Sequence, residues 1–485
     1  MNYKMICRFL GQILSVEAFF LLPALGISLG YGRWNAAIAF AVTFGIMALI
    51  AGLMLLIGRR AGKLFGAREG MVCVGLGWVV LSALGCLPFV FSGEIPRYID
   101  AFFEIVSGFT TTGSSILAAP EDLTEGILYW RSFSHWLGGM GVLVFLLAVA
   151  PGSKGGFTMH LLRAESPGPD VGKLVPKMQK TAMILYLIYI CLTVINVAFL
   201  LFGGEMGFLE ALCTAFGTAG TGGFGARSTS LAEFGAYTQN VTTIFMFLFG
   251  VNFSCYYLLL LGNFKSVFKD EELRTYFLLA LTVIVLIAFN IHDRYTSLEE
   301  TIRHSAFQVS SIMTTTGFAS TDFDTWPMFS KGLLMLLMVV GASAGSTGGG
   351  FKVARVLLVL KSLRRNIRRV MNPKKVEVVR INGRPVSETV LDNTNAYTAA
   401  YVVIIVLSFL VICLDSYVQN VATGFTAVLA CFNNIGPGLS GVGPTCNFAG
   451  FTDLSKLVLC FDMLAGRLEI FPMLILFSKG TWKGR

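Results

Sequence analysis

Long apolar runs recur along this chain, separated by short polar connections. A run of about 20 apolar residues crosses the hydrocarbon core of a bilayer as one helix. The pattern therefore predicts a protein that crosses a membrane several times. We expect spanning helices at roughly 9–29, 37–57, 71–91, 130–150, 181–202, 239–262, 276–291, 331–360, 395–415 and 455–478.

From residue 71 onward the apolar runs occur in pairs, and each pair encloses a shorter amphipathic segment. Such a segment is too short to span and is expected to enter and leave the membrane from one side. Internal repetition on this scale is the main architectural signal in the chain. The enclosed segments are 99–109, 208–218, 299–313 and 421–432.

The repetition predicts an all-α polytopic membrane protein with four pore-forming repeats around one pseudo-fourfold pore. In each repeat a first spanning helix, a pore helix, a filter loop and a second spanning helix follow one another. We expect an N-terminal two-helix hairpin at 1–70, then repeats at 71–152, 153–264, 265–394 and 395–485. The third repeat is expected to have a broken second helix and a basic cytoplasmic connection.

A glycine-containing polar loop follows each short segment, as in SGFTTTGSS at 107–115 and MTTTGF at 313–318. Irregular backbone at membrane depth is tolerated where it lines a cavity, and carbonyl and hydroxyl oxygens can replace the hydration shell of a cation. Glycine permits positive φ without a side chain in the path. The predicted ion-binding residues are Thr110, Thr111, Thr112, Gly113, Gly220, Thr221, Gly222, Gly223, Thr314, Thr315, Thr316, Gly317, Asn433, Asn434, Ile435 and Gly436.

One Gly–Thr loop alone is more simply a helix-packing position or a tight turn. Four such loops in equivalent positions favour a cation pore. Pore helices that end at the loops would point their negative dipole ends toward a cation.

Composition and charge agree with a membrane protein. Hydrophobic residues make up 55% of the chain and charged residues 13%, whereas soluble domains carry roughly 25% charged residues. With both termini cytoplasmic, most of the 37 Lys and Arg residues fall on the inner side, as the positive-inside rule requires. Orientation therefore explains the net charge of +9 better than nucleic-acid binding does. The ten scattered cysteines suggest neither a metal site nor a disulfide framework.

A small-residue run, GASAGSTGGG at 341–350, interrupts the predicted span 331–360 below the third loop. A flexible loop there could obstruct the path, although a close helix–helix contact is the alternative. Arg467 lies within the last span, where a charge is costly unless it is paired or faces a cavity; Asp462 and Glu469 are possible partners. The predicted gate is Gly345, Ser346, Thr347, Gly348, Gly349, Gly350 and Arg467.

Together these motifs resemble the Trk/Ktr/HKT superfamily of potassium transporters. The resemblance rests on TTTG in the first and third loops, TGGF in the second, NNIGPG in the fourth, the GSTGGG interruption and AGR in the last span. The two extra N-terminal spans and RSFSHWLGGMG are closer to the bacterial TrkH/TrkG branch.

The resemblance implies a K⁺-selective pathway, a homodimer in the bacterial inner membrane and a cytosolic nucleotide-binding regulatory partner of the TrkA type. It also implies that Gly113, Gly223, Gly317 and Gly436 lie in the filter, and that the 341–350 loop and Arg467 form the gate. K⁺ is the transported ion, and no organic cofactor is expected. Ser114 and the asparagine-rich fourth loop depart from the threonine pattern, so a less discriminating filter is possible.

Other interpretations remain open. A Na⁺- or H⁺-coupled symporter would keep the transport function, but the membrane interior offers few titratable groups, namely Glu17, Asp462 and Glu469. Ser343 lies in a G-x-S-x-G match, as in a serine protease, but no histidine is placed to act as its base. We therefore expect a protein that is not an enzyme. The segments 352–369 and 154–180 are the expected docking sites for the regulator, with anionic lipid as another partner for the first.

Overall fold

The computed structural model describes residues 1–59, 66–141, 178–374 and 377–482. The predicted regulator loop at 154–180 lies almost wholly outside the described residues, as do His160 and the end of the span expected at 130–150. The described chain is almost entirely helical, as predicted, and contains helices long and apolar enough to cross a membrane. These candidate spans are Tyr3–Gly30, Trp34–Gly58, Arg68–Ser92, Ala182–Phe202, Glu271–Arg294 and Glu388–Ile412.

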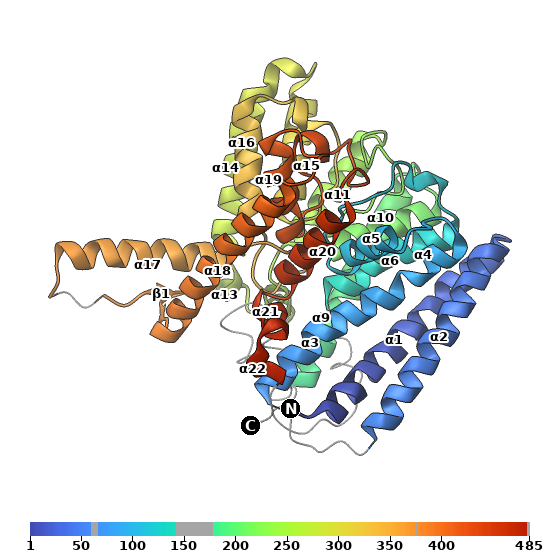
Figure 1. The fold of residues 1–485 in the computed structure, drawn as a ribbon. Helices are drawn as coiled ribbons and strands as arrows, with labels where there is room; N and C mark the ends of the chain where they lie inside the picture. Colours follow the sequence, from blue (N-terminus) through green and yellow to red (C-terminus); the bar gives the residue numbers. More distant parts are fainter. Residues whose placement is uncertain (60–65, 142–177, 375–376, 483–485) are drawn as a thin grey trace.

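An N-terminal hairpin of α1 (Tyr3–Gly30) and α2 (Trp34–Gly58) lies along one side of the bundle (Figure 1). Leu49, Leu53 and Leu56 of α2 are exposed, which suits contact with lipid. At the turn between the helices, Arg33 pairs with Glu125 at 2.9 Å. That ion pair fastens the hairpin to the first repeat.

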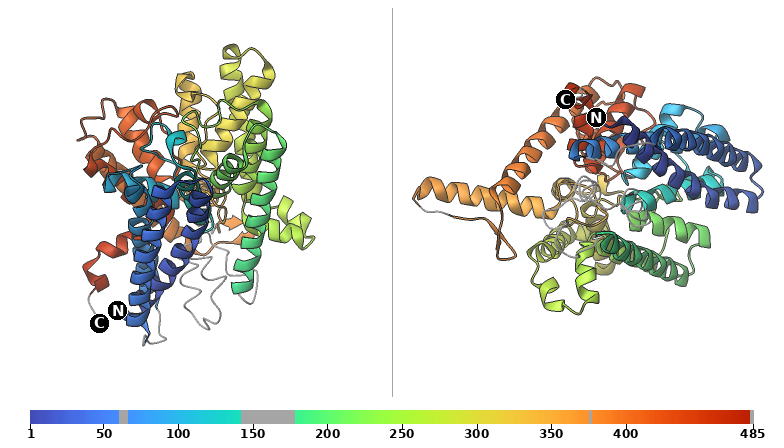
Figure 2. Two further views of the ribbon diagram at one scale, coloured as in Figure 1. Left: turned by 90° about the vertical axis from the view of Figure 1, so that its right-hand side faces the viewer. Right: turned by 90° about the horizontal axis from the view of Figure 1, so that it is seen from below.

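The four repeats follow one another around the centre in chain order when the molecule is seen from below (Figure 2). Each begins with a long helix and continues with a short pore helix, as predicted from the amphipathic segments. The first helices are α3 (Ala67–Gly85) with α4 (Leu87–Ser92), α9 (Met178–Phe202), α14 (Glu271–Ile291) and α18 (Glu388–Ile412). The pore helices are α5 (Tyr98–Phe109), α10 (Phe208–Gly220), α15 (Leu298–Met313) and α19 (Val421–Phe432).

The second helix stops early in every repeat. Only the break in the third repeat was predicted, so the continuous spans expected at 239–262 and 455–478 are wrong. In the second repeat the chain bends by 87°, because Asn252 caps a new helix by accepting a hydrogen bond from the Ser254 N–H at 2.9 Å. In the fourth, Glu469 and Ile470 have positive φ. The pieces are α6 (Glu125–Gly139), α11 (Ala236–Phe249) with α12 (Phe253–Leu260), α16 (Met328–Val339) with α17 (Val353–Met371), and α20 (Asp453–Arg467) with α21 (Phe471–Phe477).

The third repeat continues into a helix that leaves the bundle. Figure 1 shows α17 projecting sideways from the rest of the molecule. A small antiparallel pair, β1 (Arg380–Ile381) and β2 (Arg384–Pro385), follows it and leads back to α18. The remaining short elements are α13 (Phe264–Phe268), α22 (Lys479–Trp482), η1 (Pro120–Asp122), η2 (His292–Arg294), η3 (Phe323–Thr325) and η4 (Ser440–Val442).

Candidate cation pathway

The four predicted filter loops share one backbone conformation. Each contains a non-glycine residue in the left-handed region, followed two residues later by a glycine with positive φ. Each also has an N–H that donates to a carbonyl oxygen five residues back in its pore helix, for example Thr112 to Ser107 at 2.8 Å and Thr316 to Ser311 at 2.8 Å. The left-handed residues are Thr111 (φ 55°), Thr221 (54°), Thr315 (59°) and Asn434 (56°), and the glycines are Gly113 (82°), Gly223 (74°), Gly317 (86°) and Gly436 (100°).

Each filter glycine lies against the carbonyl oxygen that precedes the glycine of the next repeat. A Cβ added at Gly113 would overlap the oxygen of Gly222, and one at Gly223 would overlap that of Thr316. A Cβ at Gly317 would overlap the oxygen of Ile435. The series closes at Gly436, where a Cβ would lie 2.8 Å from the oxygen of Thr112. The four loops therefore form a closed ring, and its contacts leave no room for side chains at the glycines.

The filter side chains are largely occupied in holding the loops. The Thr110 hydroxyl donates to Val106 O at 2.7 Å, and the Thr314 hydroxyl donates to Ser310 O at 2.6 Å. Thr112 and Thr316 lie within hydrogen-bond distance of these hydroxyls. Asn434 donates to the Thr112 hydroxyl at 3.0 Å, which joins the fourth loop to the first. Backbone carbonyls and hydroxyl lone pairs are consequently the groups that can face a cation.

A cavity of about 120 Å³ opens above this ring. Its wall includes all four filter glycines, Gly113, Gly223, Gly317 and Gly436. The pore helices α5, α10, α15 and α19 end at the ring, so their negative dipole ends are directed toward it. The structure thus brings together the four loops that the sequence predicted, at one end of one cavity.

The glycine-rich loop between α16 and α17 lies directly beneath the filter. The Gly349 N–H donates to the Thr315 hydroxyl at 2.6 Å. The loop also contacts the bend of the second repeat, where the Phe253 N–H donates to Gly345 O at 3.0 Å and the Ser343 N–H donates to Gly250 O at 3.1 Å. Ser343 is therefore part of a packed loop in the third repeat.

Arg467 bridges this loop and the first repeat. Its Nη1 donates to Thr347 O at 2.7 Å, and its Nη2 donates to Gly139 O at 2.8 Å and to Gly138 O. The proposed partners of Arg467 have other contacts, since Glu469 pairs with Arg355 and the Asp462 carboxylate accepts from Ser408 at 2.7 Å. The predicted gate residues thus lie in contact, immediately below the filter.

The structure shows that the prediction for the basic segment 352–369 is wrong at Lys352. The sequence assigned it to a surface that binds a regulator, but its side chain is only 4% exposed and its Nζ donates to Gly348 O in the glycine loop. A second basic side chain therefore lies beside the predicted gate residues. The sequence feature that could have indicated its burial is that Lys352 closely follows the glycine run that breaks the helix. Hydropathy alone did not indicate it.

Two ion pairs behind the filter, one buried and one partly buried, were not predicted. Arg131 of α6 pairs with Glu104 of α5 at 2.6 Å, and Lys456 of α20 pairs with Asp100 of α5 at 2.6 Å. The second pair joins the fourth repeat to the first. Both place a cation at the outer end of a second helix, behind a pore helix.

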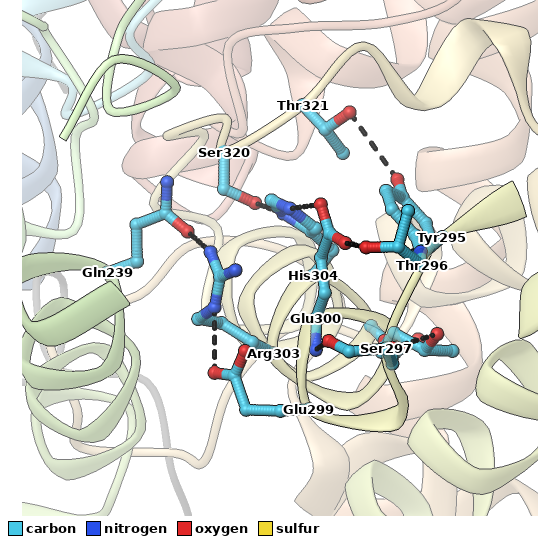
Figure 3. Close-up of polar contacts among 12 residues, drawn as sticks. Gln239, Tyr295, Thr296, Ser297, Glu299, Glu300, Arg303, His304, Ser320 and Thr321 are labelled. Carbon is cyan, nitrogen blue, oxygen red and sulfur yellow. Dashed lines mark hydrogen bonds and ion pairs between the residues drawn. The ribbon is translucent and has the colours of Figure 1, made fainter. Parts of the chain in front are cut away.

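A polar cluster holds the outer end of α15 in the third repeat (Figure 3). His304 Nδ1 lies 2.9 Å from the Ser320 hydroxyl, in the loop just after the filter. Tyr295 stacks on the His304 ring, and its hydroxyl accepts from the Trp326 indole at 3.1 Å. On the other side of the helix, Arg303 pairs with Glu299 at 2.9 Å and donates to Gln239 of α11. The cluster anchors the third filter loop from outside.

Comparison with known proteins agrees with this architecture. The family model for TrkH, described as a cation transport protein, matches residues 38–483. The chain is 36% identical to the Trk system potassium uptake protein TrkH of Salmonella typhimurium over the whole of both chains. It is 31% identical to the Trk system potassium uptake protein TrkG of Escherichia coli, over 99% of this chain and 98% of that one.

The fold also matches a solved structure. The crystal structure of the potassium transporter TrkH from Vibrio parahaemolyticus superposes with a TM-score of 0.89 at 30% identity, and the match covers all of both chains. The matched proteins are transporters and not enzymes, which excludes the protease interpretation. The chain is a membrane protein and belongs to the TrkH family of cation transport proteins.

Proposed function

We propose that this protein takes up K⁺ across the bacterial inner membrane, with both termini cytoplasmic, through the pore at the centre of the four repeats. The observation that carries the proposal is the closed ring of four filter loops at the base of one cavity. The relatives' names, Trk system potassium uptake proteins, identify the ion. The ring supplies carbonyl oxygens at membrane depth, which can replace the hydration shell of a cation.

The driving force in this proposal is the membrane potential. It contributes about 2.3 kcal/mol per elementary charge for each 100 mV. The ion would enter the outer cavity, shed water in the ring between residues 110–113, 220–223, 314–317 and 433–436, and meet the glycine loop below it. No covalent chemistry is required of the chain.

The glycine loop and Arg467 act as the gate in this account. Arg467 and Lys352 place two basic side chains on the inner side of the filter. A cation leaving the filter must pass them, and like charges repel strongly where little water screens them. Opening requires Thr347 and Gly348 to move away from the axis together with these side chains.

A homodimer and a cytosolic nucleotide-binding regulator of the TrkA type are part of the proposal. Helix α17 projects from the bundle and exposes apolar residues, among them Leu363, Ile367 and Val370. A second copy of the chain packed on this face would cover them. The same helix also exposes Arg364, Arg368 and Arg369. An acidic surface of a regulator could dock on these arginines and, through α17, pull directly on the gate loop.

Uptake into vesicles tests the transport function. Purified protein is reconstituted, an inside-negative potential is imposed, and K⁺ entry is recorded beside protein-free vesicles. Because a closed gate carries no ion, Arg467→Ala is measured in parallel. K⁺ entry in either sample above background supports the proposal, and entry that ceases when the potential is collapsed identifies the driving force. Background rates in both samples would overturn it.

A further inference from the structure

The ring of Phe224, the residue after the second filter loop, is held between two side chains of the first repeat. The guanidinium carbon of Arg131 lies 3.6 Å from the ring centroid. The imidazole of His135 stacks on the ring with centroids 4.1 Å apart. Two groups this close to one ring must occupy opposite faces. Because Arg131 and His135 are four residues apart on α6, they lie on the same side of that helix and clamp the ring between them.

Arg131 also donates hydrogen bonds to both neighbouring filter loops. Its Nη1 donates to Gly225 O at 3.0 Å, just past Phe224, and its Nη2 donates to the Ser115 hydroxyl at 3.2 Å. Its Nε donates to Glu104 at 2.6 Å. The rigid fork of a guanidinium can satisfy several acceptors in fixed directions, which a lysine ammonium cannot do.

Glu104 completes the network from the pore helix. Its carboxylate accepts from the Ile116 N–H and from the Ser115 hydroxyl, both at 2.9 Å. The side chains of Arg131 and Glu104 are 2% and 0% exposed. Apolar residues of similar volume often replace a buried ion pair without loss of stability, so stability alone does not account for charges at this place. What the ion pair adds is a fixed direction for each hydrogen bond that Arg131 and Glu104 make to the filter loops.

The clamp belongs to one interface of the four. The third repeat has Phe318 at the equivalent position, and its carbonyl accepts from the Ser311 hydroxyl of its own pore helix. The first and fourth repeats have Ser114 and Pro437 there. Within the described residues, the cation–π contacts involve Phe224, Phe234 and Tyr397. The aromatic ring after the second loop is therefore clamped by side chains of the neighbouring repeat, and at the third loop the second repeat instead contacts the backbone, through hydrogen bonds of Ser230 and Leu231 with Ala319.

We propose that Arg131, oriented by Glu104, is a positioning residue that sets K⁺/Na⁺ discrimination by clamping Phe224 and Gly225 of the second filter loop. The inference rests on the proposed transport function. Discrimination depends on the spacing and number of the coordinating oxygens. Gly223 and Gly222 immediately precede the clamped residues, so a shift of the Phe224 ring moves their carbonyls.

The test is the K⁺/Na⁺ permeability ratio of reconstituted protein, in the background of the opened Arg467→Ala gate. Phe224→Leu removes the ring and keeps an apolar side chain, and Arg131→Lys keeps the charge and removes the fork. We expect either change to lower the ratio about tenfold, equivalent to about 1.4 kcal/mol, while K⁺ still passes. Arg97→Gln is the control, since Arg97 forms an exposed ion pair with Asp453 at the same outer end; its ratio is expected to be unchanged.

A double variant, Arg131→Met with Glu104→Gln, separates positioning from burial of charge. This double variant leaves no unpaired charge. If the Arg131–Glu104 pair has only a structural role, the variant should assemble normally and have a normal K⁺/Na⁺ permeability ratio. Positioning predicts normal assembly, judged by a single size-exclusion peak, with the ratio still low. If the double variant does not assemble, Phe224→Leu decides, because it leaves the ion pair intact. An unchanged ratio in Phe224→Leu would overturn the inference, whereas absence of K⁺ flux in both the unmodified protein and the Arg467→Ala protein would instead overturn the proposed function.

Discussion

The guanidinium of Arg467 donates a hydrogen bond to the carbonyl oxygen of Thr347 at 2.7 Å, which joins the last repeat to the glycine loop of the third. The same loop reaches the filter, where the Gly349 N–H donates to the Thr315 hydroxyl. The filter, the glycine loop and the Arg467 side chain are thus connected by hydrogen bonds. A displacement of the loop must break the contact with Arg467.

Removing the positive charge of Arg467 should open the ion pathway below the filter. A unit charge about 5 Å from a passing K⁺ in an effective dielectric of about 20 costs about 3 kcal/mol. We therefore expect Arg467→Ala to raise regulator-free K⁺ flux in vesicles by about a hundredfold. Arg369→Ala, which removes an exposed arginine of α17, serves as the control and should leave flux unchanged. Equal flux in the two variants would remove Arg467 from the gate.

Lys352 should contribute a second, smaller barrier. Its ammonium donates to Gly348 O, so Lys352→Met removes both the charge and a contact that holds the loop. We expect flux to rise about tenfold and to rise further when the change is combined with Arg467→Ala. Lys265→Met, at an exposed lysine of α13, is the matched comparison. A fall in flux would show that Lys352 supports the open path instead.

Asp415 should make the stability of the outer loops depend on pH. Although burial raises the pKa of a carboxyl, hydrogen bonds from Ser455, Tyr417 and Thr452 hold the pKa of Asp415 below its ordinary value. A carboxyl with a lowered folded pKa stabilises the fold above the unfolded pKa, about 3.9. That contribution is lost as the pH falls through this value and the lower folded pKa.

The corresponding variant is Asp415→Asn. Its thermal midpoint should lie below that of the unmodified protein at pH 7, and the difference should close below about pH 3. Asp293→Asn changes an exposed carboxyl that is 88% accessible and should have little effect. A difference between Asp415→Asn and the unmodified protein that stayed constant from pH 7 to pH 3 would contradict the assigned role.

The pore helices and the filter turns could be predicted because their signals are local. A short amphipathic segment followed by a small-residue loop is visible within about 15 residues of sequence, as at 299–317. Thr315 and Gly317 then adopt the left-handed conformations that the loop requires. Because this local pattern recurs four times, the four-repeat architecture could be predicted without knowledge of contacts between distant residues.

The breaks in the second helices could not be read in the same way. The segment 455–478 has enough apolar residues to span, yet it turns after Arg467 where the Ile470 N–H donates to Ala465 O at 2.7 Å. Apolar residues on all sides give no sign of where a helix ends. The bend at 250–252 likewise depends on contacts with Ser343 and Gly345 of another repeat.

The two ion pairs behind the filter were missed for a related reason. Asp100 and Lys456 are 356 residues apart, so nothing in a local pattern joins them. Glu104 lies in the amphipathic segment 99–109, and no local pattern there indicates that it is fully buried against Arg131. A charge that is buried and paired cannot be distinguished by type alone from a charge that faces water.

The most direct measurement is the K⁺ and Na⁺ flux of Gly317→Ser against Gly332→Ser in vesicles, with the opened Arg467→Ala gate in both. A Cβ at Gly317 overlaps the carbonyl oxygen of Ile435, whereas a Cβ at Gly332 meets no atom within 4 Å. We expect Gly317→Ser to lose K⁺ flux or its preference for K⁺ over Na⁺, while Gly332→Ser keeps both. Unchanged flux and selectivity in Gly317→Ser would contradict the assignment of the four loops as the selective path.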